Sequence, residues 1–219
     1  MATLAILPVK RLSDAKQRLE PGLDPVMRRL LSQAMLADVL IALRRARQVS
    51  QTLAVTSDDD AQRIAGAYGA RLVSDEGGGH NGAAARGIRY ALEHRFERAV
   101  LVPGDCPALS SAELDELLEG TPAARRVVIV PDRHRTGTNA LVLTPPDALE
   151  PAFGPGSRAR HVASAAARGV PCEVVELPTL ALDIDTPDDL DALDQVLAST
   201  HGGAAHTRGI LRRLRARTG

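Results

Sequence analysis

The chain has 219 residues, is 44% hydrophobic and carries 27 basic and 27 acidic side chains, which gives a formal net charge of zero at pH 7. Its length fits one α/β domain, and its charge balance argues against general nucleic-acid binding, which needs a basic excess. No apolar run approaches the roughly 18 residues of a membrane span, and the beginning lacks the layout of a signal peptide, so we expect a cytoplasmic protein with no membrane contact. The two cysteines, Cys106 and Cys172, lack metal-ligand spacing, and we expect them to be reduced thiols.

Strands and helices alternate along the first third of the chain. Short apolar runs at residues 3–8, 53–55 and 71–73 predict strands, and helices are expected from Pro25 to about residue 46 and from residue 58 to about residue 68. The segment between the first strand and the first helix is basic. Its Lys10, Lys16 and Arg18 suit the phosphates of a nucleotide, although a solvated loop would carry similar charge.

A polar, glycine-rich loop at residues 74–82 precedes the next predicted helix, at residues 83–94. Glycines let a ligand approach the backbone closely, and Asn81 could pair with the edge of a base. A flexible linker would have a similar composition, so both interpretations of this loop stay open.

A buried strand at residues 99–102 is ended sharply by Pro103 and Gly104, and the first side chain beyond them is the carboxylate of Asp105. In an open α/β sheet, ligands bind outside the carboxyl ends of the strands, where an acid can hold Mg²⁺. The alternative for a single acid is that it caps the next helix or closes a turn. Cys106, directly beside it, is interpreted as a small packing residue rather than as a nucleophile.

The second half predicts strands at residues 127–130, 140–143, 173–177 and 180–184, and helices that begin near residues 110, 157 and 187. The turn at 154–157 opens one of these helices, where backbone amides and the hydroxyl of Ser157 can form an anion site. In the last strand, Asp183 and Asp185 alternate with apolar residues and would share one face. Like charges that close repel unless a cation or hydrogen bonds offset them, so Asp105, Asp183 and Asp185 form a candidate metal site.

The alternation throughout predicts a three-layer α/β/α sandwich with a mostly parallel sheet. We expect this domain to span residues 1–199. Residues 200–219 are rich in Gly, Ala and Arg, and they predict a basic C-terminal tail, either frayed or an amphipathic helix, with no part in the chemistry.

These motifs resemble those of the guanylyltransferases of coenzyme F420 biosynthesis, which are relatives of the molybdenum-cofactor nucleotidyltransferases. The resemblance spans nearly the whole chain, from Leu7-Pro8-Val9-Lys10 through Ala15-Lys16-Gln17-Arg18-Leu19 to Leu182-Asp183-Ile184-Asp185-Thr186-Pro187. Its most specific parts are Gly137-Thr138-Asn139-Ala140-Leu141 and Phe153-Gly154-Pro155-Gly156-Ser157, which is followed by His161.

The resemblance implies a Rossmann-like nucleotidyltransferase fold and a reaction in which GTP and a small phospho-acid give a guanosine-diphosphate-linked product and pyrophosphate. It also implies Mg²⁺ as cofactor and keeps a homodimer as one option for the assembly. Matching positions give each predicted residue a role: nucleotide binding by Pro8, Lys10, Lys16, Arg18 and Asn81; acceptor binding by Thr138, Gly154 and Ser157; metal binding by Asp105, Asp183 and Asp185; and catalysis by Lys16 and Asp105.

Phosphoenolpyruvate is the expected acceptor, because the Arg- and Ala-rich composition is typical of a high-GC bacterium. The same framework would serve 2-phospho-L-lactate or 3-phospho-D-glycerate. Two further hypotheses stay open, namely a broader nucleotidyltransferase that acts on a sugar phosphate or molybdopterin, and a GTP-sensing module without catalysis.

The chemistry fits the residues without the resemblance as well. An acceptor phosphate is already ionised at pH 7, so its attack on the α-phosphate of a nucleotide needs no general base. The reaction requires positioning, charge neutralisation and a metal that holds the triphosphate. The predicted lysines and acids can supply these, which explains why no Ser-His-Asp or Cys-His set is needed.

Overall fold

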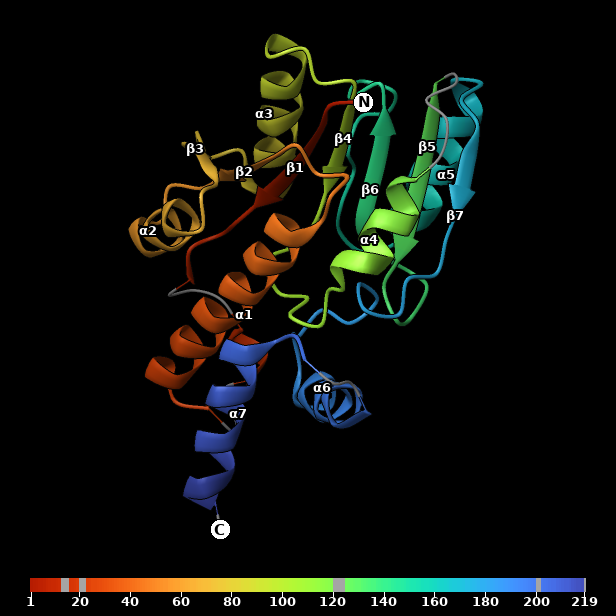
Figure 1. Ribbon diagram of the computed structural model, residues 1–219. Coiled ribbons are helices and arrows are strands. Elements are labelled where there is room, and N and C mark those ends of the chain that lie inside the picture. The colour runs from red at the N-terminus through yellow and green to blue at the C-terminus, as the bar shows by residue number, and fades with distance from the viewer. Residues whose placement is uncertain (13–15, 20–22, 120–124, 200–201, 219) are drawn as a thin grey trace.

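The computed structural model describes residues 1–12, 16–19, 23–119, 125–199 and 202–218, and these residues are built around one seven-stranded sheet (Figure 1). The strand order is β3-β2-β1-β4-β6-β5-β7. β6 runs antiparallel to both of its neighbours, and the other pairs are parallel. The strands are β1 (Thr3–Pro8), β2 (Gln51–Val55), β3 (Arg71–Val73), β4 (Arg98–Leu101), β5 (Arg126–Pro131), β6 (Thr138–Thr144) and β7 (Cys172–Val174).

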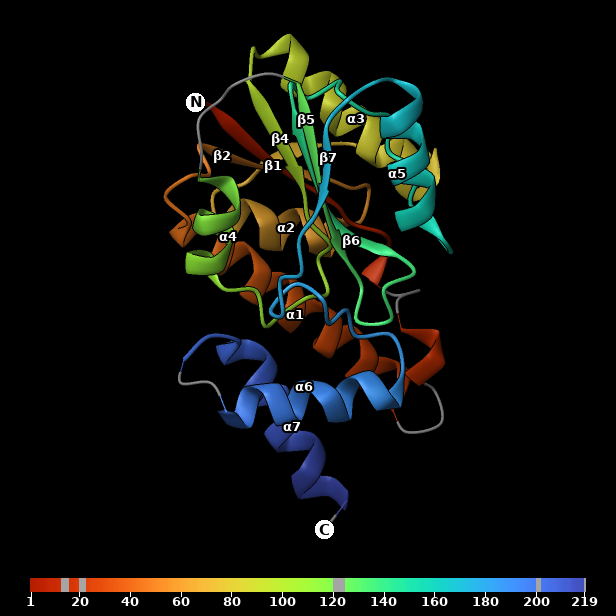
Figure 2. The ribbon, with the colours of Figure 1, turned by 90° about the vertical axis from the view of Figure 1, so that its right-hand side faces the viewer.

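Helices cover both faces of the sheet, as Figure 2 shows from the side. Apolar residues of α1, α2 and α4 pack on one face and those of α3 and α5 on the other. The central strands β1 and β4 are buried throughout, which explains why they are apolar after their first residues, Thr3 and Arg98. The helices are α1 (Pro25–Arg45), α2 (Asp59–Ala67), α3 (Gly79–Glu93), α4 (Ser111–Leu118), α5 (Ser157–Ala167), α6 (Pro187–Ser199) and α7 (Ala205–Thr218), with a short 3₁₀ helix, η2 (Gln17–Leu19). The predicted three-layer, mostly parallel α/β/α sandwich is confirmed.

Short polar residues begin three of the helices. Asp24 accepts a hydrogen bond from the N–H of Met27 at the start of α1, and Asp58 accepts one from Ala61 at the start of α2. Ser110 caps α4 in the same way. These side chains satisfy N–H groups that have no partner within the helix, so the helix starts predicted near residues 25, 58 and 110 are confirmed. The helix predicted at residues 83–94 begins earlier, at Gly79, so the last residues of the predicted glycine-rich loop belong to α3.

One predicted strand is wrong. Residues 180–186 form a loop and not a strand. Leu180, Leu182 and Ile184 are nevertheless buried, while the acids between them are partly exposed. The alternation of apolar and acidic residues therefore reflects the burial of every second side chain, which occurs here without a strand. The loop obtains this burial by crossing the edge of the sheet, where the N–H of Ile184 donates to the carbonyl of Asp105.

The segment that follows α6 belongs to the core. Of the two alternatives for it, the structure shows the helix, and α7 packs against α1 beside α6, away from the sheet (Figures 1 and 2). Ile210 and Leu211 are buried in the same cluster as Met35 of α1. The buried carboxylate of Asp38 in α1 accepts the N–H groups of His206 and Thr207 and so caps α7. No helix among the described residues is long and apolar enough to cross a membrane.

Truncation after Ser199 is expected to lower the melting temperature, because it removes α7 and uncovers apolar side chains of α1. Each large apolar side chain returned to water costs about 1.5–3 kcal/mol. Circular dichroism on heating measures the change. The matched control replaces Arg212 and Arg213, both exposed on α7, by glutamine. If the truncated chain has the same melting temperature as the full-length protein, α7 contributes nothing to stability.

Candidate active site

A cavity of about 890 Å³ opens at the carboxyl ends of β1 and β4. The chain passes from β1 to β2 and β3 on one side and returns to β4 on the other side of β1, so the strand order reverses between β1 and β4. Ligands of open α/β sheets bind at such a reversal. Because β6 is antiparallel, its first residues, Thr138 and Asn139, lie at the same edge and line the cavity. The volume is in the range of small-molecule sites, about 300–1,000 Å³.

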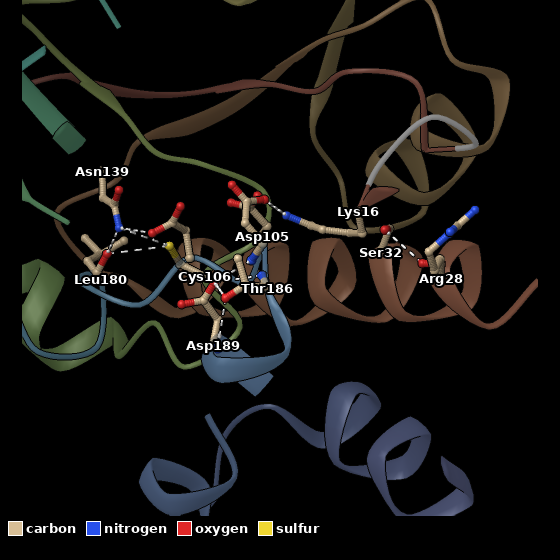
Figure 3. A network of polar contacts seen from close by, with 11 residues as sticks. Lys16, Arg28, Ser32, Asp105, Cys106, Asn139, Leu180, Thr186 and Asp189 are labelled. Carbon is tan, nitrogen blue, oxygen red and sulfur yellow. Dashed lines mark hydrogen bonds and ion pairs between the residues drawn. The ribbon is translucent and has the colours of Figure 1, made fainter. Parts of the chain in front are cut away.

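The ammonium of Lys16 is bonded to two carboxylates at this edge, and Figure 3 shows it pointing toward Asp105. Its Nζ donates to Oδ2 of Asp105 at 2.5 Å and to Oδ1 of Asp185 at 2.9 Å. The lysine side chain is 5% exposed, against 30% for Asp105 and 49% for Asp185. The backbone of Lys16 has a φ of 63°, a region that residues other than glycine rarely occupy. The local strain accompanies a side chain held in one place by two ion pairs, as is common at functional sites.

The ionisation of this cluster follows from burial and from its charges. Burial acts to lower the pKa of Lys16, but the charges of Asp105 and Asp185 outweigh it and raise the pKa above its ordinary value. Burial acts to raise the pKa of Asp185, and the Lys16 ammonium outweighs it, so that pKa lies below its usual range. The ion pair is therefore fully charged at neutral pH.

Asp183 stands apart from this pair. Burial, and then the charge of Asp105, raise the pKa of Asp183 to about 6. Its Oδ1 accepts a hydrogen bond of 3.2 Å from the side-chain amide of Asn139, which also donates to the carbonyl of Leu180 at 2.8 Å. Asn139 thus joins β6 to the acidic loop, a role that the sequence did not assign to it.

In the metal-free protein, Asp183→Asn is expected to raise the melting temperature at pH 7.5 and to change it little at pH 4. An unfolded Asp183 ionises near pH 3.9, whereas the folded one ionises near pH 6. The free energy of unfolding therefore falls as the pH rises between these two values, and it stays lower above them. Asparagine does not ionise, so the variant avoids this loss. Thermal unfolding with a chelator present measures the difference, with the exposed Asp191→Asn of α6 as control. A lower melting temperature at pH 7.5 would contradict this account.

The loop that carries Asp183 and Asp185 is held by Asp189. The Oδ2 atom of Asp189 accepts the N–H groups of Asp185 and Thr186 at 3.0 and 2.8 Å, and its Oδ1 pairs with Arg133 at 2.6 Å. The N–H of Asp189 in turn donates to the Thr186 hydroxyl at 3.4 Å. This reciprocal arrangement is a capping box. Its spacing, an acid three residues after Thr186, was the signal in the sequence that could have identified Asp189.

The three predicted metal ligands lie in one region without forming a ready metal centre. Among the residues that the structure describes, no group of three or more His, Cys, Asp or Glu side chains lies close enough to hold a metal ion. Lys16 takes the place between Asp105 and Asp185. All three acids are still near enough that Asp105 and Asp185 raise the pKa of Asp183. A magnesium site here stays a prediction.

The predicted nucleotide-binding residues divide into two groups. Pro8, Lys10 and Lys16 line the cavity, whereas Arg18 is exposed on η2 and is absent from the lining. Asn81 is absent from it as well. Its Nδ2 donates to the carbonyl of Phe153 at 3.2 Å, and its Oδ1 accepts the N–H of Phe153 at 2.8 Å. The side-chain amide expected to pair with a base is thus engaged with the backbone.

Two polar side chains that line the cavity, one in the β3–α3 loop and one in the first turn of α3, were not predicted from the sequence. Asp75 and His80 both line the cavity there. Burial, and then the charge of Lys10, lower the pKa of His80. The ring of His80 also makes an edge-to-face contact with Phe153, with the ring centroids 5.0 Å apart. Glycine-rich composition pointed to this loop, but it could not show which polar side chains face the cavity.

The predicted acceptor-binding residues also divide. Thr138 and Gly154 line the cavity. Ser157 begins α5 as predicted, but its side chain is buried, it is absent from the lining, and its N–H donates to the carbonyl of Gly154 at 3.0 Å. Ser157 therefore fixes the turn that presents Gly154. Cys106 is buried, and burial raises the pKa of its thiol, in agreement with a packing role.

Comparisons with known proteins find relatives along nearly the whole length of the chain. The family model described as "Guanylyl transferase CofC like" matches residues 3–218. A phosphoenolpyruvate guanylyltransferase of Conexibacter woesei is 51% identical over 98% of this chain and 97% of its own length. A 2-phospho-L-lactate guanylyltransferase of Methanothermobacter thermautotrophicus is 35% identical over 98% of this chain and 92% of its own length.

A solved structure shows the same fold at low sequence identity. A nucleotidyl transferase of Methanothermobacter thermautotrophicus superposes with a TM-score of 0.68 at 19% identity, covering 91% of this chain and 99% of that one. Together, the match of the family model along nearly the whole length and the identity to the curated relatives show that the chain belongs to the CofC-like guanylyl transferase family.

Proposed function

We propose that the protein transfers the GMP moiety of GTP to phosphoenolpyruvate, which releases pyrophosphate and gives enolpyruvoyl-2-diphospho-5′-guanosine for coenzyme F420 biosynthesis. The observation that carries this proposal is the 51% identity, over 98% of the chain, to a relative named phosphoenolpyruvate guanylyltransferase. The cavity at the reversal of strand order, with the Lys16 cluster inside it, supports the same reaction class.

The reaction joins an acceptor phosphate oxygen to the α-phosphorus of GTP and breaks the bond between that phosphorus and the oxygen that bridges to the β-phosphate. The acceptor oxygen is already ionised, so no proton has to be removed from it. Negative charge grows on the departing pyrophosphate, and a cation nearby stabilises that charge. Lys16 and Lys10 are the lysines that line the cavity, and we assign this neutralisation to them.

Magnesium is the proposed cofactor, held by Asp105 with Asp183 and Asp185. The donor set fits, because Mg²⁺ prefers carboxylate oxygens together with substrate phosphates and keeps several waters. When bound, the ion would neutralise and orient the triphosphate. The acids then share two cations, the metal and Lys16. Asp105 and Asp185, which are both paired with the ammonium, would link the two.

Recognition of the acceptor is assigned to Thr138 and Gly154, which both line the cavity. Thr138 offers a hydroxyl at the start of β6, and Gly154 offers backbone without a side chain in the way. Gly154 has a φ of 116°, which a residue with a Cβ would adopt only with strain. A small phosphorylated acid presents carboxylate and phosphate oxygens, and these accept hydrogen bonds from such donors.

A second acceptor is favoured by a specific observation, the 35% identity to a relative named 2-phospho-L-lactate guanylyltransferase. A competition assay decides between the acceptors. GTP, Mg²⁺ and equal concentrations of phosphoenolpyruvate, 2-phospho-L-lactate and 3-phospho-D-glycerate are incubated with the enzyme, and mass spectrometry measures the initial product ratio, which equals the ratio of kcat/KM values. We expect the phosphoenolpyruvate adduct to dominate. If a different adduct dominates, the acceptor is reassigned. If no adduct forms with any of the three acids, the proposed function is wrong.

A further inference from the structure

His161 is a buried side chain that touches the site from behind. It lies on α5, is 0% exposed, and is absent from the cavity lining. Both of its ring nitrogens have partners. Nε2 lies 2.8 Å from the backbone N of Ala152, and Nδ1 lies 2.9 Å from Oγ1 of Thr138. The ring therefore connects the 152–156 turn to the threonine that lines the cavity.

These two contacts determine which nitrogen carries the proton. A backbone N–H can only donate, so Nε2 of His161 must accept from Ala152 and must be unprotonated. In the neutral ring the proton is then on Nδ1, which donates to Oγ1 of Thr138. A hydroxyl has one donor and two acceptor positions. Because Oγ1 of Thr138 accepts this hydrogen bond from His161, its own O–H is left to donate elsewhere.

We propose that His161 is a positioning residue that, through its Nδ1–H, turns the hydroxyl proton of Thr138 toward the anionic acceptor in the cavity. The inference rests on the proposed function, because it takes the partner of Thr138 to be the phospho-acid. Among the described residues, Thr138 Oγ1 has no other hydrogen-bond partner than His161. A threonine whose proton is already directed outward reaches an anion without reorientation, which is the benefit of preorganised donors.

The surroundings keep the ring neutral and in place. Burial, and then the charge of Arg160, lower the pKa of His161 to about 4. The ring makes an edge-to-face contact with Phe153, with the centroids 5.4 Å apart. The guanidinium of Arg160 donates to the carbonyl of Ala152 at 2.9 Å and so holds the other side of the same peptide segment. The turn and the threonine are thereby fixed relative to each other.

The first test is spectroscopic and needs no substrate. ¹⁵N nuclear magnetic resonance of the histidine rings distinguishes the two neutral tautomers and the imidazolium, and His161→Gln identifies the signal among the six histidines of the chain. We expect His161 to be the neutral Nδ1–H tautomer at pH 7. The Nε2–H tautomer or a charged ring would overturn the proposal, whatever reaction the enzyme catalyses.

The second test separates the two hydrogen bonds of the ring. Glutamine places its amide oxygen near the position of Nε2 and keeps the acceptor for Ala152, whereas asparagine places its amide near Nδ1 and keeps a donor for Thr138. With phosphoenolpyruvate and saturating GTP, His161→Gln is expected to raise the acceptor KM about three- to tenfold, in line with one lost hydrogen bond. His161→Asn should raise it less, although it lowers the melting temperature, and the KM for GTP should stay unchanged in both.

A double-mutant cycle with Thr138 distinguishes positioning from general support of the fold. Thr138→Val removes the hydroxyl at nearly constant shape and is expected to raise the acceptor KM about tenfold to a hundredfold, and Thr138→Ser should restore most of it. In the valine background, His161→Gln should add less than about twofold, because residues that act through one contact are not additive. Effects that multiply, or a parallel loss of GTP affinity, would overturn the proposal. An inactive wild type would refute the proposed function and leave the spectroscopic test standing.

Discussion

Lys16→Met is expected to lower the turnover number for guanylyl transfer by about 10²–10³-fold, the usual cost of removing one group that stabilises charge in a transition state. Methionine keeps the length and most of the volume of lysine but cannot carry charge. The ammonium lies 2.5 Å from Asp105 and 2.9 Å from Asp185, so its loss leaves two carboxylates facing the phosphates of GTP. Repulsion then opposes nucleotide binding and also the growth of negative charge on the pyrophosphate group in the transition state.

Steady-state kinetics with pyrophosphate release as the signal measure this effect. The matched control is Arg63→Met, which removes a cation from an exposed ion pair with Asp60 on α2 and should leave the rate unchanged. A melting temperature recorded beside the kinetics shows that the Lys16 variant is folded. If Lys16→Met turns over within a few-fold of wild type, Lys16 has no part in catalysis.

Asp105→Asn is expected to lower turnover by about 10²–10³-fold for a related reason. Asp105 follows β4 at the reversal of the strand order, anchors Lys16, and is a proposed ligand of Mg²⁺. Asparagine preserves the shape and a hydrogen bond to the ammonium, so the fall in turnover measures the contribution of the negative charge alone. We expect added Mg²⁺ to raise the rate of this variant more than that of the wild type, because weakened metal binding is partly offset by concentration.

The control for this prediction is Asp191→Asn, which changes an exposed acid of α6 outside the cavity lining. Titration of Mg²⁺ at saturating GTP and phosphoenolpyruvate gives the apparent metal affinity of each protein. Equal rates and equal metal dependence for Asp105→Asn and wild type would remove Asp105 from both of its assigned roles.

The fold was predictable from the sequence because its signals are local. The apolar run of β1, the caps Asp58 and Ser110, and Pro25 at the start of α1 each report a structure formed within a few residues. The strand predicted at residues 180–184 was wrong, because alternate side chains are buried in an extended loop as well as in a strand. The role of α7 was also hidden, because its buried partner Asp38 lies in α1, far away in the sequence.

The site was predictable only in part, for the same reason. A carboxylate after a strand end can be located from the sequence, and Asp105 lies where that argument placed it. The partner of a side chain cannot be located so readily. The amide of Asn81 bonds to the backbone of Phe153, and the side chain of Ser157 is buried behind the turn at Gly154. Asn139, His161 and Asp189 position the site through contacts that only the folded chain brings together.

Guanylyl transfer to a phospho-acid can be followed with two labelled forms of GTP, wild-type enzyme, Mg²⁺ and phosphoenolpyruvate. One GTP carries radioactive phosphorus at the α-position and the other at the γ-position. We expect the α-label to enter the guanosine-containing adduct and the γ-label to leave in pyrophosphate, and we expect neither change without the acceptor. Release of the γ-label as inorganic phosphate, its transfer to the acceptor, or no conversion of GTP would show that the enzyme does not transfer a guanylyl group to phosphoenolpyruvate.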